Sequence, residues 1–404
     1  MGALEVAIRL SMHEMGGKLL ERIINSDGGA YRGRKLSCEC GEEKDFIEYR
    51  YKKIHTVLSR INVKRSYYYC DECNEGICPK DKELDIVATS FSPGVRRMMG
   101  LVGAHHPFKR GKNLIEELAG IELNTKSVER VSESIGEEIL KVERQWCREA
   151  LSGKVISMEP IPILYVAIDG TAVPTLKGWK EAKLGCCFTQ STRDKQGNPI
   201  RDPHSTTYTG AIENAELFGQ RIFAEATMRG IQSAEKVVVI GDGAKWIWNI
   251  ADEHFYSAIQ IVDLYHAREH IWDLGKLLYG IEAEGTAKWV KERHLELENG
   301  DIESLLDSLR SLRAESEEEE EKIRQEIGYF ENNKRRMRYR EFRDEGLFIG
   351  SGVVEAGCKS VIAHRLKQSG MRWTVDGANT ILSLRTCQFN GSRWEDYWAD
   401  RCTA

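Results

Sequence analysis

Three carboxylates in this chain have the surroundings expected of metal ligands. Asp169 and Asp242 each come at the end of an apolar run that resembles a buried strand, and each lies next to a glycine. A charge at the edge of a core is costly unless it is paired or binds a cation, and ligands gather where the strands of an open α/β sheet end. Carboxylate oxygens suit hard cations. Together with Glu355, the two aspartates predict a site for divalent metal ions.

Glu355 also has an ordinary structural explanation. Ser351 is placed to cap a helix that carries Glu355 in its first turns, where the helix dipole favours an acidic residue. Lys359 lies one turn further on and can form an ion pair with Glu355. Only the two aspartates favour a metal-binding role for Glu355.

Four cysteines near the N-terminus form a second candidate metal site. They occur as two close pairs on either side of residues 46–69, which are rich in β-branched and aromatic residues. Two thiolate pairs joined by a hairpin match the tetrahedral geometry of structural zinc. The first pair is one residue shorter than usual, so Cys78 is an alternative ligand, and reduced, partly buried thiols are the alternative to zinc. The four predicted ligands are Cys38, Cys40, Cys70 and Cys73.

Composition limits the class of protein. The chain has 404 residues, 41% of them hydrophobic, which is enough for two or three domains. No apolar stretch reaches the length of a membrane span, and the first residues lack the features of a signal peptide, so we expect a cytoplasmic protein without a membrane partner. Eleven cysteines, an odd number, argue against a disulfide scaffold. Those without a metal-ligand spacing are interpreted as core or incidental thiols: Cys147, Cys186, Cys187, Cys358, Cys387 and Cys402.

The elements that must position these groups can be placed from periodicity. Residues 6–24 predict an amphipathic helix, and residues 114–120 predict a helix followed by a glycine turn. Thr125 can cap a next helix through Ile135, which gives a helix-turn-helix shape, although an ordinary helical hairpin has the same pattern. Five basic residues make this region a candidate DNA-binding surface: Lys109, Arg110, Lys112, Lys126 and Arg130.

The sequence pattern of the central region predicts an α/β domain. Strands are expected at 163–168, 184–189, 206–212, around 237 and at 259–264, with a helix at 215–228. Adjacent strands followed by a helix fit a mixed sheet. Residues 282–342 are charged and helical and are interpreted as an insertion. Within it, six glutamates in 315–321 favour a solvated face, whereas the basic residues 334–340 can bind phosphates.

The residues in this order resemble a DDE-type bacterial insertion-sequence transposase of the ISKra group. The resemblance rests on segments that span most of the chain: Tyr67–Cys73, Ser92–Arg97, Asp169–Thr171, Gly241–Trp248, Asp263–His266, Gly350–Glu355, Arg365–Lys367 and Gly370–Trp373. Each segment is short and common. Their order and spacing together are specific to such transposases.

This resemblance implies a ribonuclease-H-like core in which Asp169, Asp242 and Glu355 hold two Mg²⁺ or Mn²⁺ ions. Such enzymes cut DNA at the ends of a mobile element, its terminal inverted repeats, and join the freed 3′-hydroxyl to target DNA. They form no covalent protein intermediate, and they usually act as oligomers at the bacterial nucleoid. One metal can activate water or the 3′-hydroxyl while the other stabilises the departing oxygen.

The resemblance also gives roles to neighbouring residues. Asp263 and His266 are similar to a signature of Mutator-like transposases and are expected to support the site. Alternatively, Asp263, His266 and His270 can bind a metal themselves. Trp246 and Trp248 can stack on an unpaired base or pack in the core. Because catalysis requires a polyanion beside Glu355, four basic residues after it are expected to follow the DNA backbone: Lys359, Arg365, Lys367 and Arg372.

The expected organisation is an α/β catalytic core with a mixed sheet and a helical insertion, preceded by a small β module and a helical region. The boundaries are 1–30 for an N-terminal helix, 31–85 for the zinc-ribbon-like module, 86–155 for the helix-turn-helix-like region, 156–280 and 345–404 for the core, and 281–344 for the insertion. Two other functions remain open. One is a transposase-derived DNA-binding regulator without cleavage, and the other is a metal-dependent hydrolase of small phosphate esters.

Overall fold

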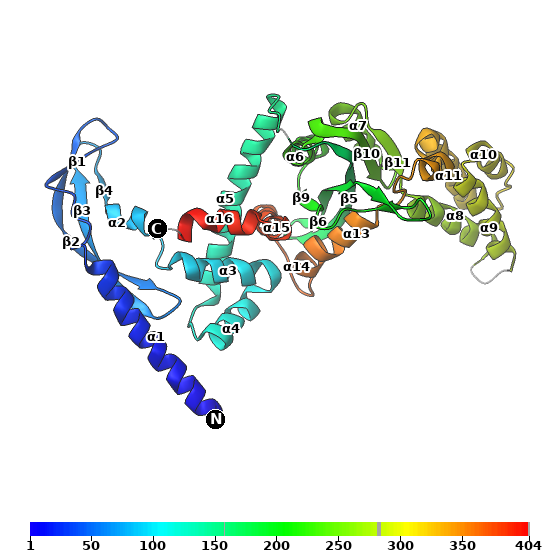
Figure 1. Ribbon diagram of the computed structural model, residues 1–404. Helices are drawn as coiled ribbons and strands as arrows, with labels where there is room; N and C mark the ends of the chain where they lie inside the picture. Colours follow the sequence, from blue (N-terminus) through cyan, green and yellow to red (C-terminus); the bar gives the residue numbers. More distant parts are fainter. Residues whose placement is uncertain (157, 281–283, 403–404) are drawn as a thin grey trace. The chain divides into compact units, whose positions relative to one another are not determined.

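The computed structural model describes residues 1–156, 158–280 and 284–402, and the chain divides into two compact units (Figure 1). The first contains Met1–Gly136 together with the residues from Ser392 on, and the second contains Glu137–Gly391. The boundary falls within one long helix, α5 (Thr125–Leu151). The last helix, α16 (Arg393–Cys402), belongs to the first unit, whereas the sequence analysis grouped it with the catalytic core.

The first unit begins with α1 (Gly2–Asn25), which confirms the predicted N-terminal helix. An antiparallel sheet follows in the order β1 (Lys35–Ser37), β2 (Glu43–His55), β3 (Arg60–Cys70) and β4 (Glu75–Ile77). A short helix, α2 (Pro79–Glu83), completes this module. Its small core contains Ile54, Ile61, Val63 and Ile86, with Leu20 and Ile24 of α1 packed against it.

Side chains of α1 also occupy the outer edge of β3. The backbone N–H of Asn62 donates to Glu21 at 2.8 Å, and that of Lys64 donates to Asn25 at 2.8 Å. The next N–H along this edge, at Ser66, donates to the carbonyl of Gly29 at 2.9 Å. The polar groups of β3 that lack a neighbouring strand are therefore hydrogen-bonded to α1 and the turn after it.

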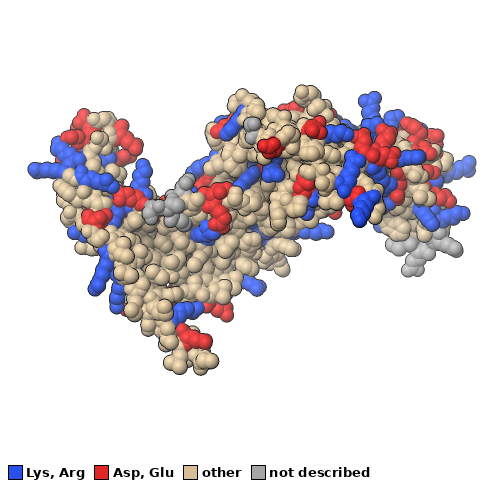
Figure 2. Space-filling model, viewed as in Figure 1, with Lys and Arg blue, Asp and Glu red and all other residues tan. Residues whose placement is uncertain are grey.

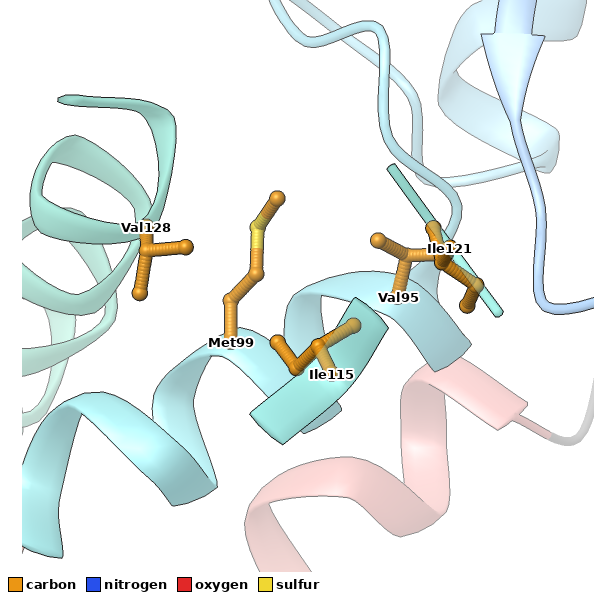
Figure 3. Close-up of a cluster of buried hydrophobic side chains, with 5 residues drawn as sticks. All are labelled: Val95, Met99, Ile115, Ile121 and Val128. Carbon is orange, nitrogen blue, oxygen red and sulfur yellow. The ribbon is translucent and has the colours of Figure 1, made fainter. Parts of the chain in front are cut away.

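Three helices of the first unit surround a second core. They are α3 (Pro93–His105), α4 (Phe108–Ala119) and the first part of α5, and Figure 3 shows the buried side chains that they share. Helix α4 ends at Gly120, which has the left-handed φ of 70° that favours glycine. Asn124, not the predicted Thr125, caps α5: its side chain accepts the N–H of Ser127 at 2.7 Å. Helix α5 also runs far beyond the predicted Ile135.

The second unit is built on a five-stranded mixed sheet in the order β11-β10-β5-β6-β9. The strands are β5 (Ile161–Thr175), β6 (Gly178–Gln190), β9 (Thr207–Ala211), β10 (Ala234–Gly241) and β11 (Ile259–Val262), and the excursion between β6 and β9 carries a small ribbon of β7 (Thr192–Arg193) and β8 (Pro199–Ile200). β6 is antiparallel to both of its neighbours, β5 and β9, whereas β5, β10 and β11 are parallel. The predicted mixed α/β sheet is confirmed.

Helices cover both faces of this sheet (Figure 1). Adjacent strand residues face opposite sides. A side chain at Gly185 of β6 would meet Phe218 and Ile222 of α6 (Ala215–Met228), whereas Leu184 lies against Gly357 at the end of α13 (Gly352–Gly357). The remaining elements around the sheet are η1 (Ile231–Ser233), α7 (Lys245–His254), the π-helical turn η3 (Cys358–Ala363), α14 (His364–Leu366) and α15 (Val375–Phe389).

The helical insertion follows β11. After α8 (Leu264–Tyr279) come α9 (Glu284–Asn299), α10 (Ile302–Arg310), α11 (Glu317–Asn333), η2 (Lys334–Arg336) and α12 (Tyr339–Asp344). Residues 281–283 of the predicted insertion lie outside the described residues. Within the described ranges, no helix combines the length and the apolar character that crossing a bilayer requires.

Candidate functional site

Asp169 lies inside a strand, not at its end as the sequence pattern suggested. β5 continues to Thr175 because it pairs with β6 along its whole length, and Asp169 stands opposite Leu184. Pairing with β10, in contrast, stops at Ala167, so Asp169 comes just after the parallel part of the sheet. The carboxylate is half-buried and accepts the N–H of Gly170 at 2.7 Å.

Asp242 follows the last residue of β10, as predicted. β10 is the parallel neighbour of β5, which brings Asp242 to the same edge of the sheet as Asp169. Its carboxylate accepts the N–H of Ala244 at 2.8 Å and holds the turn into α7. Gly243 in this turn has a φ of 102°, and a Cβ there would lie 2.6 Å from the Tyr329 ring. The turn therefore requires glycine for both its backbone and its close packing.

Glu355 lies on the short helix α13, whose contacts orient its carboxylate. The hydroxyl of Ser351 donates to Glu355 Oε1 at 2.8 Å, and His266 Nε2 lies 4.0 Å from the same oxygen. Among the described residues, Glu355 forms no ion pair with Lys359. Glu355 does lie in the first turn of α13, where the helix dipole favours it, but the predicted i, i+4 pair is not formed, and the Ser351 side chain hydrogen-bonds to Glu355 and does not cap the helix.

Asp263 links the helices that carry His266 and Glu355. It caps α8 by accepting the His266 N–H at 2.8 Å, and its other oxygen accepts the N–H of Ser351 at the start of α13. The residue is fully buried. Because each oxygen accepts a backbone N–H from a different helix, Asp263 is placed to position these two helices.

The electrostatics of Asp169 show that the predicted carboxylates are neighbours. Burial raises the pKa of Asp169, hydrogen bonds from the Cys358 thiol and the Gly170 N–H oppose this, and the negative charge of Asp242 raises it further. The imidazole of His266 is close enough to lower the same pKa. The topology therefore gathers Asp169, Asp242, His266 and, through His266, Glu355. Their oxygens are not within 4.8 Å of one another as a closed ligand set.

Cys358 was interpreted as an incidental core thiol, and the structure gives it a contact with the site. It is buried in the first position of the π-helical turn and donates its S–H to Asp169. Burial, followed by the Asp169 charge, raises the pKa of Cys358. Sequence spacing offered no signal for this contact because a lone cysteine has no partner motif.

The insertion contributes a residue that the sequence analysis missed. Tyr329 of α11 donates its hydroxyl hydrogen to the backbone carbonyl of Asp242 at 3.0 Å. Its ring stacks on His270 with the ring centroids 3.8 Å apart. His270 Nδ1 in turn lies 2.8 Å from the buried carboxylate of Glu326. These contacts occupy His270 and argue against the alternative metal site of Asp263, His266 and His270.

The basic residues after Glu355 divide into two groups. Lys359, Lys367 and Arg372 are exposed, and Lys367 donates to Thr171 Oγ1, two residues beyond Asp169. The prediction for Arg365 is wrong. This residue is fully buried, and its guanidinium carbon lies 4.8 Å from the centre of the Trp373 ring. A phosphate cannot reach it in this structure. The helical pattern could not distinguish this inward position from its exposed neighbours.

Other residues that were candidates for contacts with DNA make contacts within the second unit. Trp248 is buried under Arg336, and Trp246 packs against Phe218 and the ammonium of Lys183, which favours core packing over base stacking. In the basic segment 334–340, Lys334 and Arg338 form ion pairs with Glu303 and Glu341. Figure 2 shows acidic and basic side chains intermixed over the insertion.

The four predicted cysteines come together in the first unit. Cys38 and Cys40 precede β2, Cys70 is the last residue of β3, and Cys73 lies in the turn from β3 to β4. Among the described residues they are the only group of three or more His, Cys, Asp or Glu side chains whose ligand atoms all lie within 4.8 Å of one another. The sulfur atoms of Cys38 and Cys73 are 3.5 Å apart, and those of Cys40 and Cys70 are 3.7 Å apart. Cys78 is not part of this group.

These distances fit a tetrahedral metal. Zn–S bonds of about 2.3 Å place sulfur atoms about 3.8 Å apart. The backbone N–H of Cys40, with help from Lys44 and the neighbouring thiols, lowers the pKa of Cys38 to about 6, which favours the metal-binding thiolate. Lys44 is 3% exposed, and its position beside the cluster was missed because a lone lysine in a strand has no spacing signal. The cluster can hold a structural metal ion.

The candidate DNA-binding residues of the first unit lie near the turn between α4 and α5 and at the start of α4. Lys109, Arg110, Lys126 and Arg130 are exposed. Lys112 forms an ion pair with Glu116, and Lys126 forms one with Glu129 at 2.9 Å. Part of the positive charge is thus offset within each helix.

Comparison with known proteins places the chain in a family. A protein of Streptococcus gallolyticus described as "UPF0236 protein in vanSb 3'region" is 23% identical over 363 residues, which cover 87% of this chain and 75% of that protein. The model of the uncharacterised protein family UPF0236 matches residues 39–401, which include the three carboxylates and three of the four clustered cysteines. This match covers most of the chain, and the protein therefore belongs to the UPF0236 family.

Proposed function

We propose that this protein is a metal-dependent DNA transposase of the DDE type. The observation that carries the proposal is the convergence of Asp169, Asp242 and the Glu355–His266 pair at one edge of a mixed sheet, from four separate segments of the chain. Asp263 and Tyr329 hold these segments in position through hydrogen bonds to their backbone. An arrangement that positions so many carboxylates beside one another favours cation binding.

The sheet order supports a ribonuclease-H-like core. Three antiparallel strands, β5, β6 and β9, are followed by two strands parallel to β5, and the first and fourth strands are neighbours. The first carboxylate is on the first strand, the second follows the fourth, and the third is on a later helix. This is the distribution that the resemblance implies for the catalytic triad.

The donor set fits two hard divalent cations, Mg²⁺ or Mn²⁺, held by Asp169, Asp242 and Glu355. Bound ions at such a site activate a water or a 3′-hydroxyl and stabilise the departing oxygen. The protein's own part is to orient the three carboxylates. Ser351 orients Glu355, the Cys358 thiol and the Gly170 N–H orient Asp169, and Tyr329 fixes the Asp242 turn.

The remaining surfaces suit a polyanionic substrate. Lys367 and Lys359 are exposed on the segment after Glu355, beside the proposed reaction centre. In the first unit, the exposed basic residues of α4 and α5 are proposed to contact the terminal repeats in a helix-turn-helix manner. We propose zinc as the metal of the four-cysteine cluster, where it stabilises the β module beside this region.

The test is Mg²⁺-dependent nicking of DNA that carries the inverted repeats flanking the reading frame. We expect Asp242→Asn to reduce nicking at least about a hundredfold, because a metal ion supplies several kcal/mol of charge stabilisation. Glu253→Gln, an exposed carboxylate on the helix after Asp242, is the matched control. Undiminished nicking by Asp242→Asn contradicts the site. Binding of the repeats without nicking by the unmodified chain favours a regulator, and hydrolysis of small phosphate esters alone favours a hydrolase.

A further inference from the structure

One face of α1 is apolar and exposed. Six apolar side chains on it have 58% to 71% of their surface accessible to solvent: Leu4, Ile8, Met12, Met15, Leu19 and Ile23. At 100° per residue they fall within an arc of about 100°, the width of a helix face that normally packs on a partner. We call this set the α1 stripe.

The opposite side of α1 is already used by the same chain. Gly17 is buried against Ser59, and Leu20 and Ile24 pack on the core under the hairpin. Glu21 and Asn25 bond to the edge of β3. The helix, α1 in Figure 1, is therefore fixed to its own unit by one side, and the α1 stripe stays exposed along its length.

The α1 stripe is complementary to itself when two copies of the helix run antiparallel. With the two-fold axis between residues 13 and 14, Met12 lies level with Met15 of the second copy. The same register places Ile8 level with Leu19 and Leu4 level with Ile23. Every apolar residue meets another apolar residue, which is the property of an isologous two-fold interface.

The charges beside the stripe select the same arrangement. Glu5 and Arg22 lie on opposite borders of the stripe near opposite ends of α1, and the antiparallel register places them at the same level across the interface. A parallel pair would instead place Glu5 beside Glu5 and Arg22 beside Arg22. One acidic and one basic residue beside the stripe also disfavour docking on an anionic membrane, which attracts basic helices.

We propose that two copies of this chain associate through the α1 stripe as an antiparallel, two-fold symmetric helix pair. The proposal does not depend on the transposase function, because association is measured without DNA or divalent metal. Sedimentation equilibrium of the full chain is expected to give a dimer. Ile8→Glu should raise the dimer dissociation constant at least about a hundredfold, since two isoleucines leave each interface.

Two comparisons make the test specific. Val6→Glu changes an apolar residue that is 49% exposed but lies off the stripe, and we expect it to leave the dimer intact. Glu5→Arg and Arg22→Glu should each weaken association about tenfold, and the double variant should restore it, since only the antiparallel register pairs these positions. A monomer at all concentrations, a dimer insensitive to Ile8→Glu, or no recovery in the double variant overturns the proposal. Binding to anionic vesicles without dimerisation overturns it as well.

Discussion

At the scale of single residues, Asp263 connects the two helices that carry His266 and Glu355. Its two oxygens accept one N–H from the helix of His266 and one from the helix of Glu355. Since the side chain is fully buried, neither N–H can turn to water if the acceptor is lost. The relative positions of two proposed site residues therefore depend on this one carboxylate.

Asp263→Asn leaves one acceptor oxygen where two are needed. We expect the free energy of unfolding, measured in urea, to fall by about 1–3 kcal/mol because one buried N–H is left without an acceptor. DNA nicking should fall as well. Asp301→Asn is the matched control, because Asp301 caps α10 at an exposed position through one oxygen only. Asparagine is an equally good cap, so that variant should stay within about 0.5 kcal/mol of the original. Equal losses in the two variants would contradict the bridging role.

At the scale of elements, α11 of the insertion stabilises the turn that carries Asp242. Tyr329→Phe keeps the ring on His270 and removes only the hydrogen bond to the Asp242 carbonyl. We expect a loss of about 1 kcal/mol in unfolding free energy and slower nicking at saturating metal. Tyr256→Phe is the control, because the Tyr256 side chain is 88% exposed. A Tyr329→Phe variant with unchanged nicking would show that the insertion does not act on Asp242.

The attachment of α11 should also depend on pH through Glu326. Burial raises the pKa of Glu326, but hydrogen bonds from His270 and Lys322 outweigh it, so the pKa lies below the ordinary 4.5. A carboxyl group whose pKa is lowered in the folded chain stabilises the fold at pH values above its ordinary pKa. This stabilisation is lost as the pH falls through the lowered pKa. We expect the free energy of unfolding of Glu326→Gln to fall less steeply below pH 4.5 than that of the original chain. Urea unfolding at a series of pH values measures this difference.

At the scale of the whole molecule, the two units are expected to respond differently to loss of metal. The four-cysteine cluster closes a β module with few buried side chains, whereas the second unit has its own sheet core. Metal binding to such a module is coupled to its folding. A strong chelator should therefore expose residues 31–85 to limited proteolysis and leave 161–280 protected. Cys70→Ser should reproduce the pattern without chelator, and proteolysis unaffected by either change would contradict a structural metal.

The sequence predicted the parts of this molecule that depend on local pattern. The strands, the mixed sheet, the cysteine pairs and the position of Asp242 followed from periodicity and spacing. Asp169 was placed at a strand end because its apolar run stops there, but the length of β5 is set by its pairing with β6. Contacts between distant segments, such as Tyr329 with Asp242 or Cys358 with Asp169, leave no local signal. The burial of Arg365 is likewise decided by Trp373 and not by its own neighbours in sequence.

The hydrogen bonds between α1 and β3 also bear on aggregation. A strand with unpaired N–H groups is a template on which other chains can add strands. Glu21 and Asn25 occupy two of these N–H groups, at Asn62 and Lys64. Truncation of α1 would open this edge to amyloid-like strand addition, so point substitutions on the α1 stripe are the safer way to separate two copies of the protein.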